Sequence, residues 1–350
     1  MNISWSVHIV QKGDTLESVA QGLGIKGGES LREYHNTYCE LKYLINYNDL
    51  KGIKELILPS TQEIKEIKET EKKIRILSSL PLHYLPQNFH KPSYDIDETI
   101  ETSSKEPFTV SYKTTLKTTK EKEGTIVSLA NSHFQKEEET PEDKISTLAI
   151  ACINAIYPIE FIINPGGQII NIKNHQEIIN KFKERKLDLL TYFSGEINQA
   201  YIDTFEKTLT DRKKILKSYC STLLYQVLFP NMSWFSKEEK KDYFYFQPNS
   251  YNVESAVITQ HDFENTDYIK TIVTSSYEEG STFQEILCKK VIEYSQTTID
   301  PQEEDLSNWQ GTINFTYYTS RKNKQLLKAE AELKIENNQE IYVKHTLKIN

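Results

Sequence analysis

Two groups of residues in this chain combine side chains that catalyse reactions or bind metals in other proteins. His35 and Cys39 stand four residues apart in "EYHNTYC", a spacing that places both on one face of a helix. An imidazole beside a thiol can generate a thiolate nucleophile, or the pair can supply two ligands of a zinc site. The closest other histidines are His8, His83 and His90, and no second Cys/His pair lies nearby. We therefore interpret the pair as a structural feature of a helix surface.

The second group is acidic. His261, Asp262 and Glu264 lie together in "HDFENTD" after a predicted strand, where they could bind a metal ion or transfer protons. Glu238 and Glu239 in "SKEEKKD" match the solvated start of a helix. The chain has no GxSxG, HExxH, Walker or dinucleotide-binding glycine motif. The sequence therefore predicts a protein that is not an enzyme, with no catalytic residues, no metal site and no cofactor.

The bulk composition disfavours several classes of protein. The chain has 350 residues and a net charge of −8, which fits a soluble globular protein and argues against a nucleic-acid partner. Its 4 cysteines form no CxxC pair, as expected of reduced thiols. The most apolar stretch, residues 145–157, is too short to span a bilayer, and the first residues lack the features of a signal peptide. We therefore expect no membrane span and a cytoplasmic location, with the periplasm as the alternative.

Three regions differ in composition. Residues 1–60 form a compact pattern that closes with "ELILPS". Residues 61–106 are charged and then rich in proline, which predicts a linker whose first part could form a short helix. Residues 107–350 are mostly β-rich and form the third region.

The third region predicts a sheet interrupted by helices. "FTVSYKTTLKTT" and "GTIVSLANSHF" predict one hairpin, and "KISTLAIACINAIY" predicts a helix. "IEFIINPGGQIINIKN" predicts a second hairpin, because Pro165 fixes φ and the glycines accept positive φ in its turn. A helical block follows at 175–229, and its last helix carries a wide apolar stripe over residues 215–228. Later alternating segments, including residues 283–299, predict further strands, so we expect a curved antiparallel sheet with a helical insertion packed on it.

The densest aromatic run lies in one of these later strands. Core packing explains half of an alternating aromatic row, and the other half faces outward. An outward row could stack on a sugar or contact a partner protein. The candidate partner-binding aromatics are Tyr243, Tyr245 and Tyr251.

Residues 7–59 predict a βααβ unit. "VHIV" predicts a strand, Asp14 or Thr15 is placed to cap a helix, "GESLREYHNTYC" predicts a second helix, and "KELILP" returns as the partner strand. The opening "VHIVQKGDTLESVA" and the closing Gly52 and "LILP" resemble the LysM family, with Asn36 as the counterpart of its second-helix asparagine. The resemblance implies an α+β chain: a LysM module over 1–60, a linker, and the sheet domain.

The resemblance also implies a binding groove. In LysM proteins that bind glycan, N-acetylglucosamine units lie between the turn after the first strand and the loop before the last strand. In this chain the second of these, "TYCELKYLINYNDLK", is enlarged. The residues that the resemblance places at the groove edge are Gly13, Asp14, Thr15, Leu16, Asn36, Asn48 and Leu50.

Two functions follow as expectations. LysM modules that lack an export signal occur as docking modules in contractile injection machines such as type VI secretion systems. By analogy, we expect a non-enzymatic adaptor that binds a protein partner, either an apparatus component or a cargo. The alternative is a cell-envelope protein that binds peptidoglycan.

Overall fold

The chain folds into two compact units, Met1–Ser79 and Leu80–Asn350. The computed structural model describes residues 6–47, 49–77, 80–81, 84–103, 105–122, 124–235, 240–248, 250, 252–277, 309–337 and 340–350. No helix in these ranges is both long enough and apolar enough to cross a membrane.

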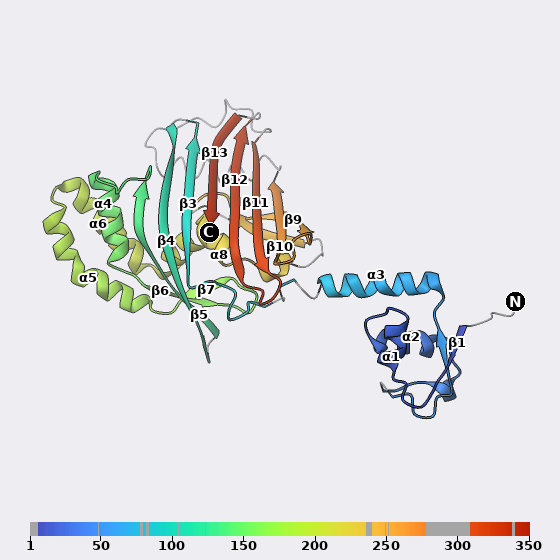
Figure 1. Ribbon diagram of the computed structural model, residues 1–350. Helices are drawn as coiled ribbons and strands as arrows, with labels where there is room; N and C mark the ends of the chain where they lie inside the picture. Colours follow the sequence, from blue (N-terminus) through green and yellow to red (C-terminus); the bar gives the residue numbers. More distant parts are fainter. Residues whose placement is uncertain are drawn as a thin grey trace. The chain divides into compact units, whose positions relative to one another are not determined.

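The N-terminal unit contains a two-stranded antiparallel sheet and three α-helices (Figure 1). Helix α1 begins after Thr15, because the Thr15 side chain accepts a hydrogen bond from the Ser18 amide and Ser18 bonds back to the Thr15 amide. The elements in chain order are β1 (Ser6–Ile9), α1 (Leu16–Gly22), α2 (Gly28–Tyr38), the short 3₁₀ helix η1 (Leu41–Tyr43), β2 (Glu55–Leu58) and α3 (Thr61–Leu77).

Helix α3 belongs to this unit. Ile64 and Ile67 pack against the core that Leu16, Leu31 and Leu56 help to form. The Glu71 carboxylate accepts hydrogen bonds from the Lys26 amide (3.1 Å) and the Ser30 hydroxyl (2.8 Å). The first part of the predicted linker therefore completes the N-terminal core, so this unit is larger than the βααβ module predicted over residues 1–60.

The second unit is built on one antiparallel sheet of 11 strands, in the order β7-β6-β5-β4-β3-β13-β12-β11-β10-β9-β8. Each half of this order is a meander, and the C-terminal strand joins the two halves by pairing with β3, where Ile349 lies opposite Ile96. The strands are β3 (Ser93–Thr102), β4 (Lys105–Glu121), β5 (Gly124–Lys136), β6 (Ile159–Ile163), β7 (Ile169–Ile172), β8 (Lys240–Tyr245), β9 (Asn252–Asp262), β10 (Tyr268–Tyr277), β11 (Trp309–Ser320), β12 (Leu326–Asn337) and β13 (Glu340–Ile349).

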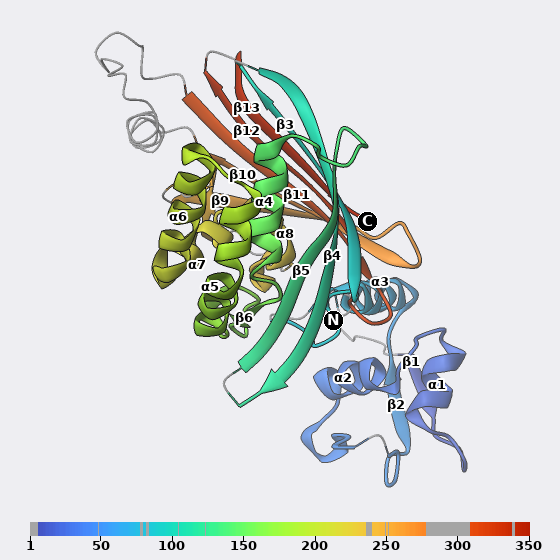
Figure 2. The same ribbon diagram turned by 90° about the vertical axis from the view of Figure 1, so that its left-hand side faces the viewer.

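Helices cover one face of this sheet (Figure 2). They connect β5 to β6 and the edge strand β7 to the opposite edge strand β8. Beneath them, Trp234 stacks on Phe244 and Phe315 with ring centroids 5.3 and 5.4 Å apart, in a core that is rich in aromatic residues. The helices are α4 (Lys144–Asn154), α5 (His175–Tyr192), α6 (Glu196–Thr210), α7 (Arg212–Cys220), α8 (Leu223–Leu228) and the 3₁₀ helix η2 (Met232–Phe235).

Several local predictions are confirmed. Strands β4 and β5 pair antiparallel, β6 and β7 form the hairpin around the Asn-Pro-Gly-Gly turn, and α4 occupies the predicted helical segment. The single helix predicted over residues 215–228 is instead two, because α7 ends at Cys220 and α8 begins at Leu223. The strand predicted at residues 283–299 lies outside the described residues.

The fold class predicted from the sequence is wrong in its outline. A LysM module, a linker and a separate sheet domain do not describe a chain whose main element is an eleven-stranded antiparallel sheet with helices packed on it. The predicted linker over 61–106 supplies helix α3 to the first unit and strand β3, at the centre of the sheet, to the second. In the sequence the polar residues of β3 indicate a linker, but they belong to a strand that buries only one face. Tyr94 and Ile96 are buried while Asp95 is exposed.

Candidate functional site

The first wall of the groove expected in the N-terminal unit lies partly at the surface. Gly13 is exposed with φ +104°, and Thr15 serves as the cap of α1. The Asp14 carboxylate accepts hydrogen bonds from the Gln11 amide (2.8 Å) and from His8 Nε2 (2.8 Å), and these two contacts lower its pKa. Leu16, by contrast, is fully buried.

Two of the residues predicted beside the second wall, Asn36 and Leu50, are engaged within the unit itself. The Asn36 side chain forms two hydrogen bonds with the backbone of Ile45, one to the N–H and one to the C=O, each 2.9 Å long. Leu50 is buried in the same core, and Asn48 lies outside the described residues. Of the described residues predicted for the groove edge, Gly13 and Thr15 are therefore exposed, Asp14 is half-buried, and Leu16 and Leu50 are buried.

The His35–Cys39 pair has a structural environment. His35 Nδ1 accepts the Ile57 amide at 3.0 Å, so its Nε2 donates to the Tyr43 carbonyl at 3.1 Å. Both ring nitrogens are thus engaged, and burial raises the pKa of the Cys39 thiol. The His35 imidazole therefore does not serve as a base for a Cys39 thiolate.

The acidic candidates form no metal site within the described part of the chain. The Asp262 carboxylate accepts the amide of Glu264 (2.8 Å), and His261 Nδ1 lies 3.1 Å from the Thr271 hydroxyl. No group of three His, Cys, Asp or Glu side chains gathers among the described residues in a way that could hold a metal ion. Glu238 and Glu239 lie outside those residues.

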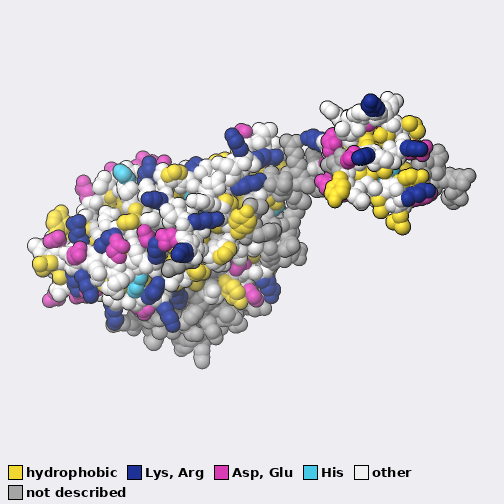
Figure 3. Space-filling view, turned by 90° about the horizontal axis from the view of Figure 1, so that it is seen from below, with side chains coloured by type: hydrophobic (Ala, Val, Ile, Leu, Met, Phe, Trp, Pro, Cys, Tyr) yellow, Lys and Arg dark blue, Asp and Glu magenta, His cyan; other side chains and the backbone are white. Residues whose placement is uncertain are grey.

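The N-terminal unit exposes several large apolar side chains. Leu41 and Tyr47 are 86% and 81% exposed, and both lie in the enlarged segment between α2 and β2. Figure 3 shows hydrophobic side chains gathered on the surface of this unit, the smaller body at the right. Among the residues that the structure describes in this unit, the exposed large apolar ones are Val7, Ile9, Tyr38, Leu41, Tyr43, Leu44 and Tyr47.

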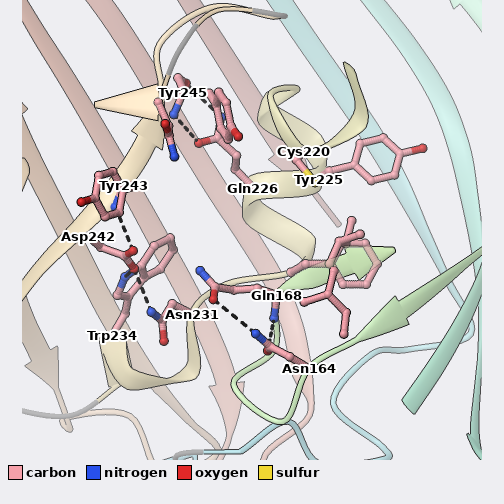
Figure 4. A pocket seen from close by; sticks show the side chains of 14 residues that line it. Asn164, Gln168, Cys220, Tyr225, Gln226, Asn231, Trp234, Asp242, Tyr243 and Tyr245 are labelled. Carbon is pink, nitrogen blue, oxygen red and sulfur yellow. Dashed lines mark hydrogen bonds between the residues drawn. The ribbon is translucent and has the colours of Figure 1, made fainter. Parts of the chain in front are cut away.

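The second unit has a cavity of about 370 Å³ between its two edge strands (Figure 4), which we call the β8 pocket. Ile169 and Ile170 come from β7, and Tyr243 and Tyr245 come from β8, so the sheet is curled far enough for both edges to line one space. Helix α8 and η2 lie in the segment that leads the chain from one edge to the other, and they add Gln226 and Trp234 to the lining.

The polar side chains of the β8 pocket are largely bonded to the protein itself. The Asp242 carboxylate accepts hydrogen bonds from Asn231 Nδ2 (2.9 Å), Trp234 Nε1 (2.7 Å) and the Tyr243 amide (2.8 Å). The side-chain amide of Gln226 donates to the Tyr245 carbonyl (3.0 Å) and accepts from the Tyr245 N–H (3.1 Å). It thereby makes the hydrogen bonds that a neighbouring strand would make at this edge. These contacts protect the edge strand and leave ring faces and aliphatic groups for a ligand.

The pocket lacks an activated nucleophile. Burial raises the pKa of the Cys220 thiol to about 11, which keeps it protonated at neutral pH. Burial also raises the pKa values of Tyr225 and Tyr245, so both phenols stay neutral. The arrangement suits apolar and aromatic contact better than proton or group transfer.

Of the three aromatics proposed from the sequence, two line this pocket. Tyr243 is 56% exposed, Tyr245 is half-buried, and Tyr251 lies outside the described residues. Gln226 and Asp242 were not predicted from the sequence. Gln226 had a visible signal, since it is a polar residue within the apolar stripe of 215–228.

Comparison with known proteins does not assign the chain to a family. No family model and no curated protein matches it. One matching structure, entitled "Lipid-protein interactions in lipovitellin", has a TM-score of 0.37 and 10% identity and covers 73% of this chain and 24% of that one. A LolA superfamily protein from Nitrosomonas europaea has a TM-score of 0.18 and 8% identity and covers 79% of this chain and 90% of that one. Both TM-scores lie below 0.5, so neither neighbour defines the fold or the function, and the expected LysM assignment is not carried further.

Proposed function

We propose that the chain is a non-enzymatic adaptor that binds protein partners through exposed apolar surfaces on its two units. The observation that carries this proposal is the set of seven exposed large apolar side chains in the described part of the N-terminal unit. Leu41 and Tyr47, the most exposed of them, make no contribution to the core that Leu16 and Leu56 share.

Exposed apolar side chains favour a protein partner over a glycan at this unit. Contiguous apolar surface on a small unit is typical of protein interfaces, whose centres are enriched in tyrosine and depleted of charge. A glycan site needs free hydrogen-bonding groups, whereas Asn36 is bonded to the Ile45 backbone and Asp14 to His8 and the Gln11 amide.

The β8 pocket supports a second docking surface. Its polar groups bond one another, while Ile170 at 53% and Tyr243 at 56% remain exposed at its rim. A concave site with an aromatic rim suits an apolar side chain that anchors a partner protein. Two surfaces on two units would let the chain hold two partners at once.

We expect substitutions on the two surfaces to separate two partners. Partners captured by the wild type from lysate are identified and purified, and their affinities are measured. The double variant Leu41→Asp and Tyr47→Asp is expected to weaken one partner at least about tenfold, because an interface anchor contributes roughly 2 kcal/mol or more. Tyr243→Asp is expected to weaken the other partner to a similar extent. Ile258→Asp, at an equally exposed position (57%) outside the pocket, controls for added charge.

The same experiment can contradict the proposal. If Ile258→Asp weakens a partner as much as Tyr243→Asp does, the β8 pocket is not a docking surface. If no partner depends on Leu41 and Tyr47, and the protein pellets with purified peptidoglycan in a manner lost on Asp14→Ala, the unit binds wall glycan instead of a protein.

A further inference from the structure

A second cavity, of about 340 Å³, lies where the centre of the sheet meets the start of α8 and the segment that follows β8. It is separate from the surfaces assigned to protein docking. Its walls are mainly apolar and include Ile100, Leu223, Phe246, Leu333 and Val343. We call it the β3–β13 cavity, because those two central strands supply its polar end.

The polar end consists of an oriented histidine. His345 lines the cavity, and its Nε2 lies 3.0 Å from Glu98 Oε2, with 13% and 14% of the two side chains exposed. The other oxygen of Glu98 accepts a hydrogen bond from the Tyr112 hydroxyl. Burial and the Glu98 charge raise the pKa of Tyr112 well above its usual value, so that hydroxyl remains a donor.

These contacts decide which atom of the His345 ring remains for a ligand. A carboxylate accepts hydrogen bonds, so Nε2 carries the proton that is donated to Glu98. In the neutral ring Nδ1 is then a hydrogen-bond acceptor.

A hydroxyl without a hydrogen-bond partner lines the same cavity. Thr102 pairs with Val343 across the two strands, and Ile100 pairs with His345, so Thr102 and His345 are diagonal neighbours on the same sheet face. Thr102 Oγ1 is buried without a hydrogen-bond partner and also lines the cavity. A buried hydroxyl without a partner costs free energy, which a ligand that binds it would recover.

We propose that the β3–β13 cavity binds a small, largely apolar molecule that carries one hydroxyl group. The ligand hydroxyl donates to His345 Nδ1 and accepts from Thr102 Oγ1, while its apolar part contacts Leu223, Phe246 and Leu333. A carboxylate ligand is disfavoured, because the Glu98 carboxylate beside His345 would repel its charge. The chemical class is therefore an apolar alcohol or phenol.

The test uses the full chain and three probes of matched shape: 4-propylphenol, its methyl ether and 4-propylbenzoate. Binding is measured by ligand-observed NMR and isothermal calorimetry at pH 7.5. We expect the phenol to bind, the ether to bind about tenfold more weakly because it cannot donate, and the benzoate to bind least. Thr102→Val, which keeps the shape of the side chain, should weaken the phenol about tenfold and should also weaken the ether, because the oxygen of either probe accepts from Thr102 Oγ1.

Two further variants make the outcome decisive. His345→Phe should weaken the phenol and spare the ether, which has no proton to donate to this ring, whereas Thr316→Val, on the uncovered face of β11, should affect neither. If His345→Phe does not fold, the Thr102→Val result decides alone. Equal binding of all three probes, failure of the phenol to bind, or a phenol affinity that Thr102→Val leaves unchanged would overturn the proposal.

Discussion

Lowering the pH from 7 to 4 is expected to remove roughly 3 kcal/mol of folding stability through His90 alone. His90 is 7% exposed and lies between Phe89 and Phe229, with ring centroids 5.2 and 5.4 Å from its own. Its Nε2–H donates to the Leu228 carbonyl at 2.7 Å. Burial lowers its pKa to about 4, because the charged ring would lose its hydration in this aromatic environment.

The direction of this pH dependence follows from the pH at which the unfolded and the folded chain each bind the proton. The unfolded chain protonates this histidine as the pH falls through about 6.5, whereas the folded chain does so only near pH 4. Between these values the unfolded state binds more protons, so stability decreases as the pH falls. Above about pH 7 the ring is neutral in both states and contributes no pH dependence.

Urea unfolding at pH 7, 6, 5 and 4 measures this effect, with His90→Gln as the comparison. The wild type should lose roughly 3 kcal/mol more than His90→Gln across this range, because acidic residues titrate equally in both proteins. His133→Gln, at an exposed position, controls for the loss of one imidazole. A constant difference between wild type and His90→Gln at every pH would contradict the assignment.

The parts of the fold that the sequence predicts are those that local chemistry determines. The Asn-Pro-Gly-Gly hairpin and helix α4 follow from turn residues and apolar periodicity within a single segment. Strand β3 does not, because its stability comes from pairing with β13, and the register that joins Ile96 to Ile349 spans most of the chain. Such pairing leaves no signal in a short window of sequence.

The candidate sites follow the same division. Tyr243 and Tyr245 could be proposed because the aromatic run is visible as a run. In the sequence Asp242 is an ordinary strand residue, and only the fold shows that Asn231 and Trp234 donate hydrogen bonds to it. The oriented imidazole of His345 depends on Glu98, a residue from the opposite end of the second unit's sequence. A non-local site of this kind becomes visible only when the strand order is known.

Gly167→Ala is expected to lower the free energy of unfolding by about 3 kcal/mol or more. Gly167 has φ +96°, a conformation that costs an L-residue about 1–2 kcal/mol. A Cβ atom at this position would also overlap the Pro230 carbonyl oxygen and lie 3.0 Å from Met232 Cγ. The backbone cannot easily give way, because the Met232 amide donates to the Gly166 carbonyl at 2.8 Å and the Leu85 amide to the Pro165 carbonyl at 2.9 Å.

The adjacent glycine provides the matched control. A Cβ at Gly166 would approach only the side chain of Asn164, at 3.3 Å from its Oδ1, so Gly166→Ala should cost at most about 1 kcal/mol. Both variants replace one glycine of the same turn by alanine, so both lower the conformational entropy of the unfolded chain by the same amount. The difference between their free energies of unfolding in urea therefore measures the strain that each alanine causes in the folded state. Equal losses would mean that the turn can move away from the Pro230 segment. A large loss confined to Gly167→Ala would mean that contact between this hairpin and the chain leading to β8 holds the two edges of the sheet around the β8 pocket.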